Sequence, residues 1–211
     1  MSEESRAPGR PKDEELQARR CEEILAAATS AFARHGYHQT DVQLIAYKLG
    51  IGKGTIYRYF STKQKLFLAA VERGLDQLSE YTCGLLEQEK PVMERMRDAC
   101  FGYFDFFDQN PDIAELLIQE RAEFCERGKS LFFDHESRDH DHWDQLMDEL
   151  EQEGRLRSPA DREKMHRAVE NMVYGIVFTS RFSPHYASFR EQAADIFDII
   201  CYGTLKQNQE N

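Results

Sequence analysis

Closely spaced cysteines are missing from this sequence, although it contains five cysteines. They are scattered along the chain as Cys21, Cys83, Cys100, Cys125 and Cys201. None of these intervals has the spacing of a zinc-binding motif or of a small disulfide-rich domain. The spacing of the cysteines therefore excludes both of those structural classes. Separated thiols in odd number are typical of a reducing compartment.

Apolar runs long enough to cross a bilayer are also missing. A transmembrane helix needs about 20 apolar residues, and no segment of this sequence approaches that length. The first residues lack the apolar core of a secretory signal. We therefore expect a cytoplasmic protein without a membrane partner. Neither a nucleophile motif nor a glycine-rich phosphate loop is present, so we expect no enzyme and no cofactor.

Strand-like alternation of apolar and polar residues is not found either, and helical spacing takes its place. The pattern predicts an all-α fold of about nine helices. Residues 1–13 are polar and contain Pro8 and Pro11, so they are expected to form a flexible arm. This arm is either disordered or lays Arg10 into a DNA minor groove. The helices are expected at residues 13–35, 40–49, 53–60, 61–78, 91–108, 110–125, 129–153, 158–182 and 188–205.

The pattern of residues 40–60, TDVQLIAYKLGIGKGTIYRYF, predicts two short helices joined by a tight turn. The pattern of Thr40 followed by Gln43 predicts a capping box at the start of the first helix, and Gly50 can end it in a left-handed conformation. In the second helix Ile56 and Phe60 are spaced to face inward, which leaves a basic and aromatic surface outside. Such a helix suits the DNA major groove. An ordinary helical hairpin, with its tyrosines in the core, is the alternative.

The charge distribution supports a local contact with nucleic acid. The whole chain has a net charge of −11, but residues 1–65 hold 11 Lys and Arg against 8 Asp and Glu. Residues 66–211 hold 16 against 30. A basic module on an acidic body can contact phosphates while the body repels them.

Eleven residues are candidates for DNA contact. Arg58 is the expected reader of a guanine edge, because a guanidinium can bind guanine through two hydrogen bonds. Gly54 belongs to the same helix start, and Gln43 is expected at the edge of the groove. The expected phosphate contacts are Thr40, Lys48, Lys63 and Lys65, and the expected groove residues are Lys53, Thr55, Tyr57, Arg58 and Tyr59.

Residues 17–77 resemble the DNA-binding region of the TetR (tetracycline repressor) family. The resemblance rests on Thr40, Ile45-Ala46, Leu49-Gly50, Lys53-Gly54-Thr55-Ile56-Tyr57, Tyr59-Phe60, Lys63 and Leu66-Phe67. Gly52 departs from the family's usual Ser or Thr, and Arg58 occupies a variable position. The resemblance implies a helix-turn-helix domain over residues 14–77 and a ligand-binding and dimerisation domain over residues 78–211. It also implies a homodimer on a double-stranded operator and a small-molecule effector.

The family's effector cavity directs attention to the aromatic residues of the second domain. Phe104 and Phe107, together with Tyr174 and Phe178, are the candidate effector-binding residues. Their type indicates a hydrophobic or aromatic ligand, and the acidic surroundings would tolerate a cation. The alternative is that these side chains only fill the core, as aromatic residues at helical spacing usually do.

The last two expected helices carry apolar faces that either close the core of the monomer or pair with a second copy. In the resembling family these helices form a four-helix bundle with their symmetry mates. Twofold symmetry also suits a major-groove reader, because two half-sites multiply specificity. The faces consist of Ala168, Met172, Gly175, Ile176 and Thr179, and of Ala193, Ile196, Phe197, Ile200, Cys201 and Leu205.

His135, Asp139 and His142 have the spacing of one helical face and could offer two imidazoles and a carboxylate to a metal. We favour a solvated charged face, and therefore expect no metal. A metal-dependent hydrolase built on these residues is the enzymatic alternative to DNA binding. A helical adaptor for proteins is a further alternative. The favoured function is a transcriptional repressor released by its effector, with an activator of the same fold as the alternative.

Overall fold

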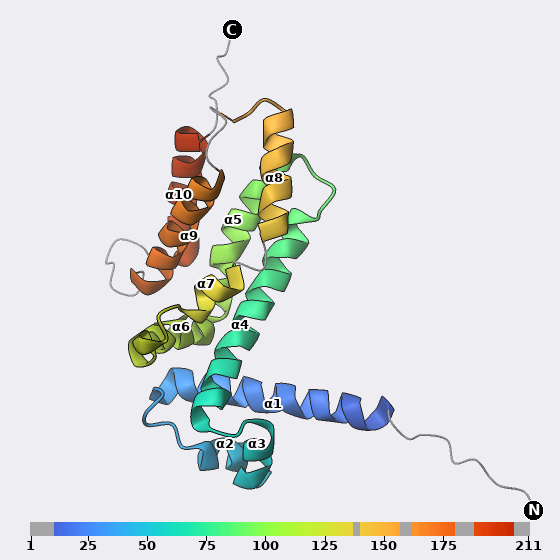
Figure 1. Cartoon of the computed structure of the whole chain (residues 1–211), viewed down its shortest axis with the longest axis vertical. Helices are drawn as coiled ribbons and strands as arrows, with labels where there is room; N and C mark the ends of the chain where they lie inside the picture. The colour runs from blue at the N-terminus through green and yellow to red at the C-terminus, as the bar shows by residue number, and fades with distance from the viewer. Residues whose placement is uncertain (1–10, 137–139, 157–161, 180–187, 205–211) are drawn as a thin grey trace, which may run out of the picture. The chain divides into compact units, whose positions relative to one another are not determined.

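A computed structural model describes residues 11–136, 140–156, 162–179 and 188–204 (Figure 1). The regular elements of these residues are all helical, as the sequence predicts. None of these helices is both long and apolar enough to cross a membrane. The elements are α1 (Pro11–His35), α2 (Val42–Lys48), α3 (Lys53–Tyr59), α4 (Lys63–Leu86), α5 (Val92–Gln109), α6 (Pro111–Glu123), the 3-10 turn η1 (Cys125–Arg127), α7 (Leu131–Glu136), α8 (His140–Gln152), α9 (Arg162–Thr179) and α10 (Phe189–Thr204).

Three boundaries differ most from the sequence-based expectation. At one of them, α4 continues to Leu86, well past the expected end at residue 78. The predicted helix over residues 129–153 is two helices, α7 and α8, whose described parts end at Glu136 and begin at His140. At the N-terminus, α1 begins at Pro11, inside the segment expected to form the arm. Proline is tolerated in the first turn of a helix because its missing N–H would have no intrahelical partner there. Arg10 lies outside the described residues.

The backbone contacts divide the chain into two compact units, Met1–Val71 and Glu72–Asn211. The first unit contains α1, α2, α3 and the start of α4. Its core includes a group of aromatic rings, in which Phe32 and Phe67 are fully buried and meet edge to face with their centroids 5.0 Å apart. Tyr37 packs against the same Phe67 ring at 5.2 Å. Edge-to-face pairs of this kind stabilise a core beyond the area they bury.

The second unit contains the rest of α4 and the helices that follow it. Within this unit α10 packs along α5 and against α9, and α5 also contacts α6 and α8 (Figure 1). At Gly102 of α5, an added Cβ would lie 2.3 Å from Leu85 Cδ1 of α4, so glycine permits the close approach of these two helices. One apolar cluster joins α5 to α8 through Val92, Met96, Leu146, Met147 and Leu150, and another joins α5 to α10 through Phe104, Ala193 and Ile196.

Carboxylates hold the starts of two helices in the second unit. Asp108 accepts hydrogen bonds from the backbone N–H groups of Phe189 and Arg190, both at 2.9 Å. The buried Glu120 accepts from the Ser130 hydroxyl at 2.8 Å and from the Leu131 N–H at 3.3 Å. Each carboxylate supplies acceptors to N–H groups that have no partner within their own helix.

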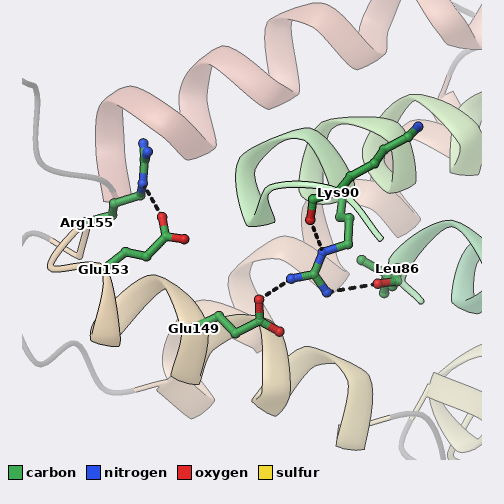
Figure 2. Close-up of polar contacts among 6 residues, drawn as sticks. Leu86, Lys90, Glu149, Glu153 and Arg155 are labelled. Carbon is green, nitrogen blue, oxygen red and sulfur yellow. Dashed lines mark hydrogen bonds and ion pairs between the residues drawn. The ribbon is translucent and has the colours of Figure 1, made fainter. Parts of the chain in front are cut away.

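Arg95 of α5 connects three segments of the second unit through its partners Leu86, Lys90 and Glu149, which Figure 2 labels. Its guanidinium donates to the Leu86 carbonyl at 3.0 Å and to the Lys90 carbonyl at 3.1 Å, and it also pairs with Glu149 of α8. The Arg95 side chain is 14% exposed. Arg155 pairs with Glu153 in the same region, but its side chain is 43% exposed. Of these two ion pairs, only Arg95–Glu149 joins separate helices. Arg95 also donates to the Leu86 carbonyl at the end of α4.

Replacing Arg95 with alanine is expected to lower the free energy of unfolding by about 2 kcal/mol, because it leaves two carbonyls and a carboxylate without their charged donor. Arg155→Ala is the matched control and is expected to cost less than about 0.5 kcal/mol, as exposed ion pairs contribute little. Urea denaturation followed by circular dichroism measures both. Equal losses for the two variants would contradict the role given to Arg95.

Candidate nucleic-acid interface and internal cavity

The turn between α2 and α3 has the hydrogen bonds of a Schellman motif. Gly50 adopts φ +64°, as the sequence predicts for the residue that ends this helix. The Gly50 N–H donates to the Tyr47 carbonyl at 3.1 Å, and the Ile51 N–H donates to the Ala46 carbonyl at 3.0 Å. These two bonds satisfy carbonyls at the end of α2 and direct the chain into α3.

The start of α2 corrects the sequence-based prediction by one residue. Asp41 is the N-cap, and its carboxylate accepts from the Gln43 N–H at 2.8 Å. That hydrogen bond, followed by the nearby Lys53 ammonium, lowers the pKa of Asp41. Thr40 is only 4% exposed, and its hydroxyl donates to the carbonyls of Gly36 at 2.7 Å and Ala31 at 3.2 Å. Thr40 therefore neither caps α2 nor belongs to a surface that could reach a phosphate.

A similar shift occurs at the start of α4. The sequence pattern there favours Ser61 as the cap, but the Thr62 hydroxyl accepts the hydrogen bond from the Lys65 N–H at 3.1 Å. At α10 the pattern of Ser188 followed by Glu191 predicts a capping box, and the Ser188 hydroxyl does accept from the Glu191 N–H at 3.2 Å. In both shifted cases the true cap is the second of two adjacent residues that can cap a helix.

Apolar side chains anchor α3 within the first unit. Ile56 is fully buried and Phe60 nearly so, as expected from their spacing. The Phe60 N–H donates to the Ile56 carbonyl at 2.9 Å, which ends the helix directly beside its buried face. Val42 and Ile45 of α2 are buried in the same unit. The orientation of α3 is therefore fixed by its buried face, and its opposite face is left at the surface.

That opposite face is basic and aromatic. Gly54, Tyr57 and Arg58 are exposed, and Lys53, Thr55 and Tyr59 are partly exposed. The Lys53 ammonium lies 5.9 Å from the centre of the Tyr57 ring, and the Arg58 guanidinium lies 5.6 Å from the Tyr59 ring. The alternative in which Tyr57 is a core aromatic is wrong, because this side chain is 37% exposed.

The other residues predicted to contact DNA differ in their exposure and in the contacts they already make within the protein. Gln43, Lys48 and Lys65 are exposed. Lys63 is only partly exposed, and its ammonium donates to the His38 carbonyl at 2.9 Å while it lies 5.0 Å from the Tyr37 ring. Lys63 thus contributes to holding the chain after α1, whatever else it contacts.

Two apolar residues of α2 are exposed, although they are not among the residues predicted from the sequence to contact DNA. Leu44 is 64% exposed and Tyr47 is 83% exposed. Both lie outside the buried set of α2, which includes Val42, Ile45 and Ala46. The spacing of these two residues outside the buried set is a sequence signal that indicates their exposure.

A surface groove beside α3 is bordered by Leu16, Gln17, Arg20, Ile51, Thr55, Arg58 and Tyr59.

A cavity of roughly 200 Å³ lies within the second unit. Side chains from α4, α5, α7, α8, α9 and α10 line it, and most of them are apolar. Burial, followed by the proximity of Cys201, raises the pKa of the lining thiol Cys100 to about 12, so this thiol stays neutral. The polar and titratable lining residues are Ser79, Thr82, Cys83, Cys100, Tyr103, His135, His142, Trp143, His166 and Glu170.

Of the four predicted effector residues, Phe104 lines this cavity and the other three are not among its lining residues. Phe107 is fully buried and packs against Phe189, with their ring centroids 5.8 Å apart. Tyr174 lies 4.3 Å from Phe178 and 4.6 Å from Phe133, centroid to centroid. Burial raises the pKa of the Tyr174 hydroxyl.

The two histidines considered as metal ligands lie on different helices and contact different carboxylates. His135 Nε2 of α7 is 2.8 Å from Asp76 Oδ1. His142 of α8 places Nε2 3.1 Å from Glu87 Oε1 and Nδ1 3.6 Å from Cys83 Sγ. Asp139 falls outside the described residues. Among the residues that are described, no three His, Cys, Asp or Glu side chains are grouped as metal ligands.

Comparison with known sequences identifies the first unit. Residues 24–70 match the family described as "Bacterial regulatory proteins, tetR family". The chain is 31% identical over 114 residues to the transcriptional regulator YhgD of Bacillus subtilis, covering 49% of this chain and 60% of that protein. It is 30% identical over 109 residues to the transcriptional activator FasR of Mycolicibacterium smegmatis, covering 52% and 48%. The chain thus spans only about half to three-fifths of the length of these relatives.

Longer matches extend the likeness to the second unit. The chain is 25% identical over 189 residues to the transcriptional repressor AcnR of Corynebacterium efficiens, covering 85% of this chain and 89% of that protein. A regulator from Saccharomonospora viridis, solved in complex with choline, superposes with a TM-score of 0.75 at 18% identity, covering 90% and 100% of the two chains. A TetR-family regulator from Pectobacterium atrosepticum gives 0.73 at 20%, covering 95% and 99%. These structures share the fold.

Proposed function

Because the chain belongs to the TetR family of bacterial regulatory proteins, we propose that it is a DNA-binding transcriptional regulator, a repressor that a small-molecule effector releases from its operator. The observation that carries this proposal is the exposed face of α3. Tyr57 and Arg58 project from a helix whose opposite side is fixed by the buried Ile56. A rigid helix with a positive, aromatic outer face fits a major groove.

The surroundings of α3 supply the second kind of contact that DNA binding needs. The lysines Lys48 and Lys65 are exposed and can neutralise phosphates, which sets the protein on the duplex without reading its sequence. Arg58 offers a planar pair of donors to a guanine edge. Tyr47, exposed on α2, adds a ring that can pack against the sugar-phosphate backbone or a thymine methyl group.

The cavity of the second unit is the proposed effector site. It is mostly apolar and carries a few polar groups, as small-molecule sites usually do. Helix α4 contributes lining residues to this cavity and also contributes Leu66 and Phe67 to the core of the first unit. A ligand that favours one position of α4 in the cavity wall would shift the population of DNA-binding states. Phe104 is the one predicted effector residue that lines the site.

We propose a homodimer that pairs α9 and α10 with their copies. The buried Ala193 and Ile196 of α10 are committed to the monomer's own core with Phe104. Ile199, on a different side of α10, is 56% exposed, and an added Cβ at Gly175 of α9 would meet nothing within 4 Å. An exposed isoleucine on α10 and an open glycine surface on α9 are both suited to close helix pairing. A dimer places two α3 helices on two half-sites.

The division of roles on the interface can be tested on an operator selected from random genomic fragments. Arg58→Ala is expected to weaken binding to the selected operator by about 1–3 kcal/mol while it leaves nonspecific binding almost unchanged. Lys48→Ala is expected to weaken binding to all sequences alike and to reduce the salt dependence of the affinity. Fluorescence anisotropy with operator and scrambled duplexes at several salt concentrations measures both effects.

Equal losses on both duplexes from both substitutions would overturn this division. Failure of the unmodified protein to bind any fragment would overturn DNA binding itself.

Ile199→Asp tests the pairing surface. A charge at the centre of an apolar helix pair is expected to shift the mass in solution from twice the chain mass of 24.6 kDa to that mass, because the carboxylate would have to be desolvated. Asp195→Asn, a neutralisation at an exposed position one turn earlier on α10, is the control and is expected to leave the mass unchanged. Light scattering after gel filtration reports the mass. A dimeric Ile199→Asp protein would place the interface elsewhere.

A further inference from the structure

One corner of the cavity in the second unit brings together a carboxylate, an imidazole and an indole. Glu170 and His166 lie one turn apart on α9, with Nε2 and Oε1 separated by 3.4 Å. Their side chains are only 15% and 14% exposed. The Trp143 ring of α8 meets the His166 ring nearly edge to face, with centroids 5.3 Å apart. All three residues line the cavity.

The formal charge of the lining is negative. Among the described lining residues Glu170 is the one acid, and none is lysine or arginine. The other two lining histidines, His135 and His142, place their Nε2 atoms beside Asp76 and Glu87, so each imidazole already has a carboxylate neighbour. A carboxylate in a mostly apolar wall loses hydration that a cation can replace. His166 stands farther from Glu170 than in a close charge-assisted hydrogen bond, so the carboxylate can still accept from a ligand.

Two further observations indicate the chemistry of a ligand that would fit this cavity. The rings of Tyr103, Phe104, Phe132 and Trp143 line the same cavity, and aromatic faces attract organic cations. The Trp143 indole N–H is buried and has no hydrogen-bond partner among the described residues. An indole N–H only donates, so a ligand that satisfies it must offer an acceptor.

We propose that the cavity binds a small organic ammonium ion with an apolar body, whose cationic head lies at Glu170 and whose neighbouring oxygen accepts from the Trp143 indole. This assignment rests on the proposed role of the cavity as the effector site and names the chemical class of its ligand. A carboxylic acid of similar size is the competing ligand class, and the negative lining disfavours it.

The chain reports on this site without a label, because Trp143 is its one tryptophan and lines the cavity. The probes are benzyltrimethylammonium, its neutral carbon isostere neopentylbenzene and the anion hydrocinnamate, each titrated while the tryptophan emission is recorded. The ammonium is expected to shift the emission and to bind at least about tenfold more tightly than either other probe, as a charge-assisted contact allows.

Glu170→Gln removes the charge and keeps the shape of the side chain. The substitution is expected to weaken binding of the ammonium by about tenfold or more and to leave the affinity for the neutral isostere unchanged. Glu163→Gln is the matched control on the same helix, since the Glu163 side chain is 78% exposed and does not line the cavity. It is expected to change neither affinity.

The acceptor contact is tested by calorimetry with Trp143→Phe. In the unmodified protein, a benzylammonium that carries a hydroxyethyl arm is expected to bind more tightly than benzyltrimethylammonium. Phenylalanine keeps an aromatic ring and removes the N–H, so the variant is expected to lose that preference and still bind both cations.

No emission change with the ammonium, tighter binding of hydrocinnamate, or an equal effect of Glu170→Gln and Glu163→Gln would overturn the assignment. None of these titrations contains DNA, so they stand apart from the test of DNA binding. If the ammonium binds as expected and DNA affinity does not change, the ligand class stands and effector control fails.

Discussion

The burial of Ile56 on the inner side of α3 is the constraint on which the candidate DNA-binding face depends. A helix as short as α3, with seven residues, has little stability of its own, so its position comes from packing. With Ile56 fully buried and Phe60 closing the helix, the remaining side chains cannot rotate toward the interior. Tyr57 and Arg58 are at the surface for this reason, and their exposure is a consequence of the core.

The second unit differs from the first because it keeps a partly polar cavity within its helical core. Arg95, Glu120 and Asp108 fix the ends of helices with charged hydrogen bonds and so define the walls. Inside those walls the unit retains Glu170 and the Trp143 N–H, polar groups that a purely structural core would exclude. The contrast between well-satisfied groups at the walls and an unsatisfied donor inside supports the proposal that the cavity binds a ligand.

Helix content and the buried face of each short helix could be predicted from the sequence, because apolar spacing and glycine stops are local signals. Gly50 and Ile56 behave as their patterns predict. The caps at Asp41 and Thr62 were assigned one residue too early, since each stands beside another capable residue and only the backbone geometry separates them.

The cavity was beyond sequence reasoning for a different cause. Its lining comes from α4, α5 and the helices from α7 onward, and spacing along one helix reveals that a residue is buried without revealing which space it borders. Phe104 and Phe107 lie three residues apart on α5 and are both fully buried, yet only the first lines the cavity. The corner of the cavity proposed to hold an ammonium ion combines Trp143 of α8 with Glu170 of α9, and no local sequence pattern connects these two residues.

Oxidative footprinting of tyrosines, read by mass spectrometry with and without the selected operator, tests the central claim most directly. Tyr57 on α3 and Tyr81 on α4 have similar exposure, 37% and 42%, and therefore similar starting reactivity. The account predicts that bound DNA protects Tyr57 and leaves Tyr81 as reactive as before. Unchanged oxidation of Tyr57 in the bound state would contradict it.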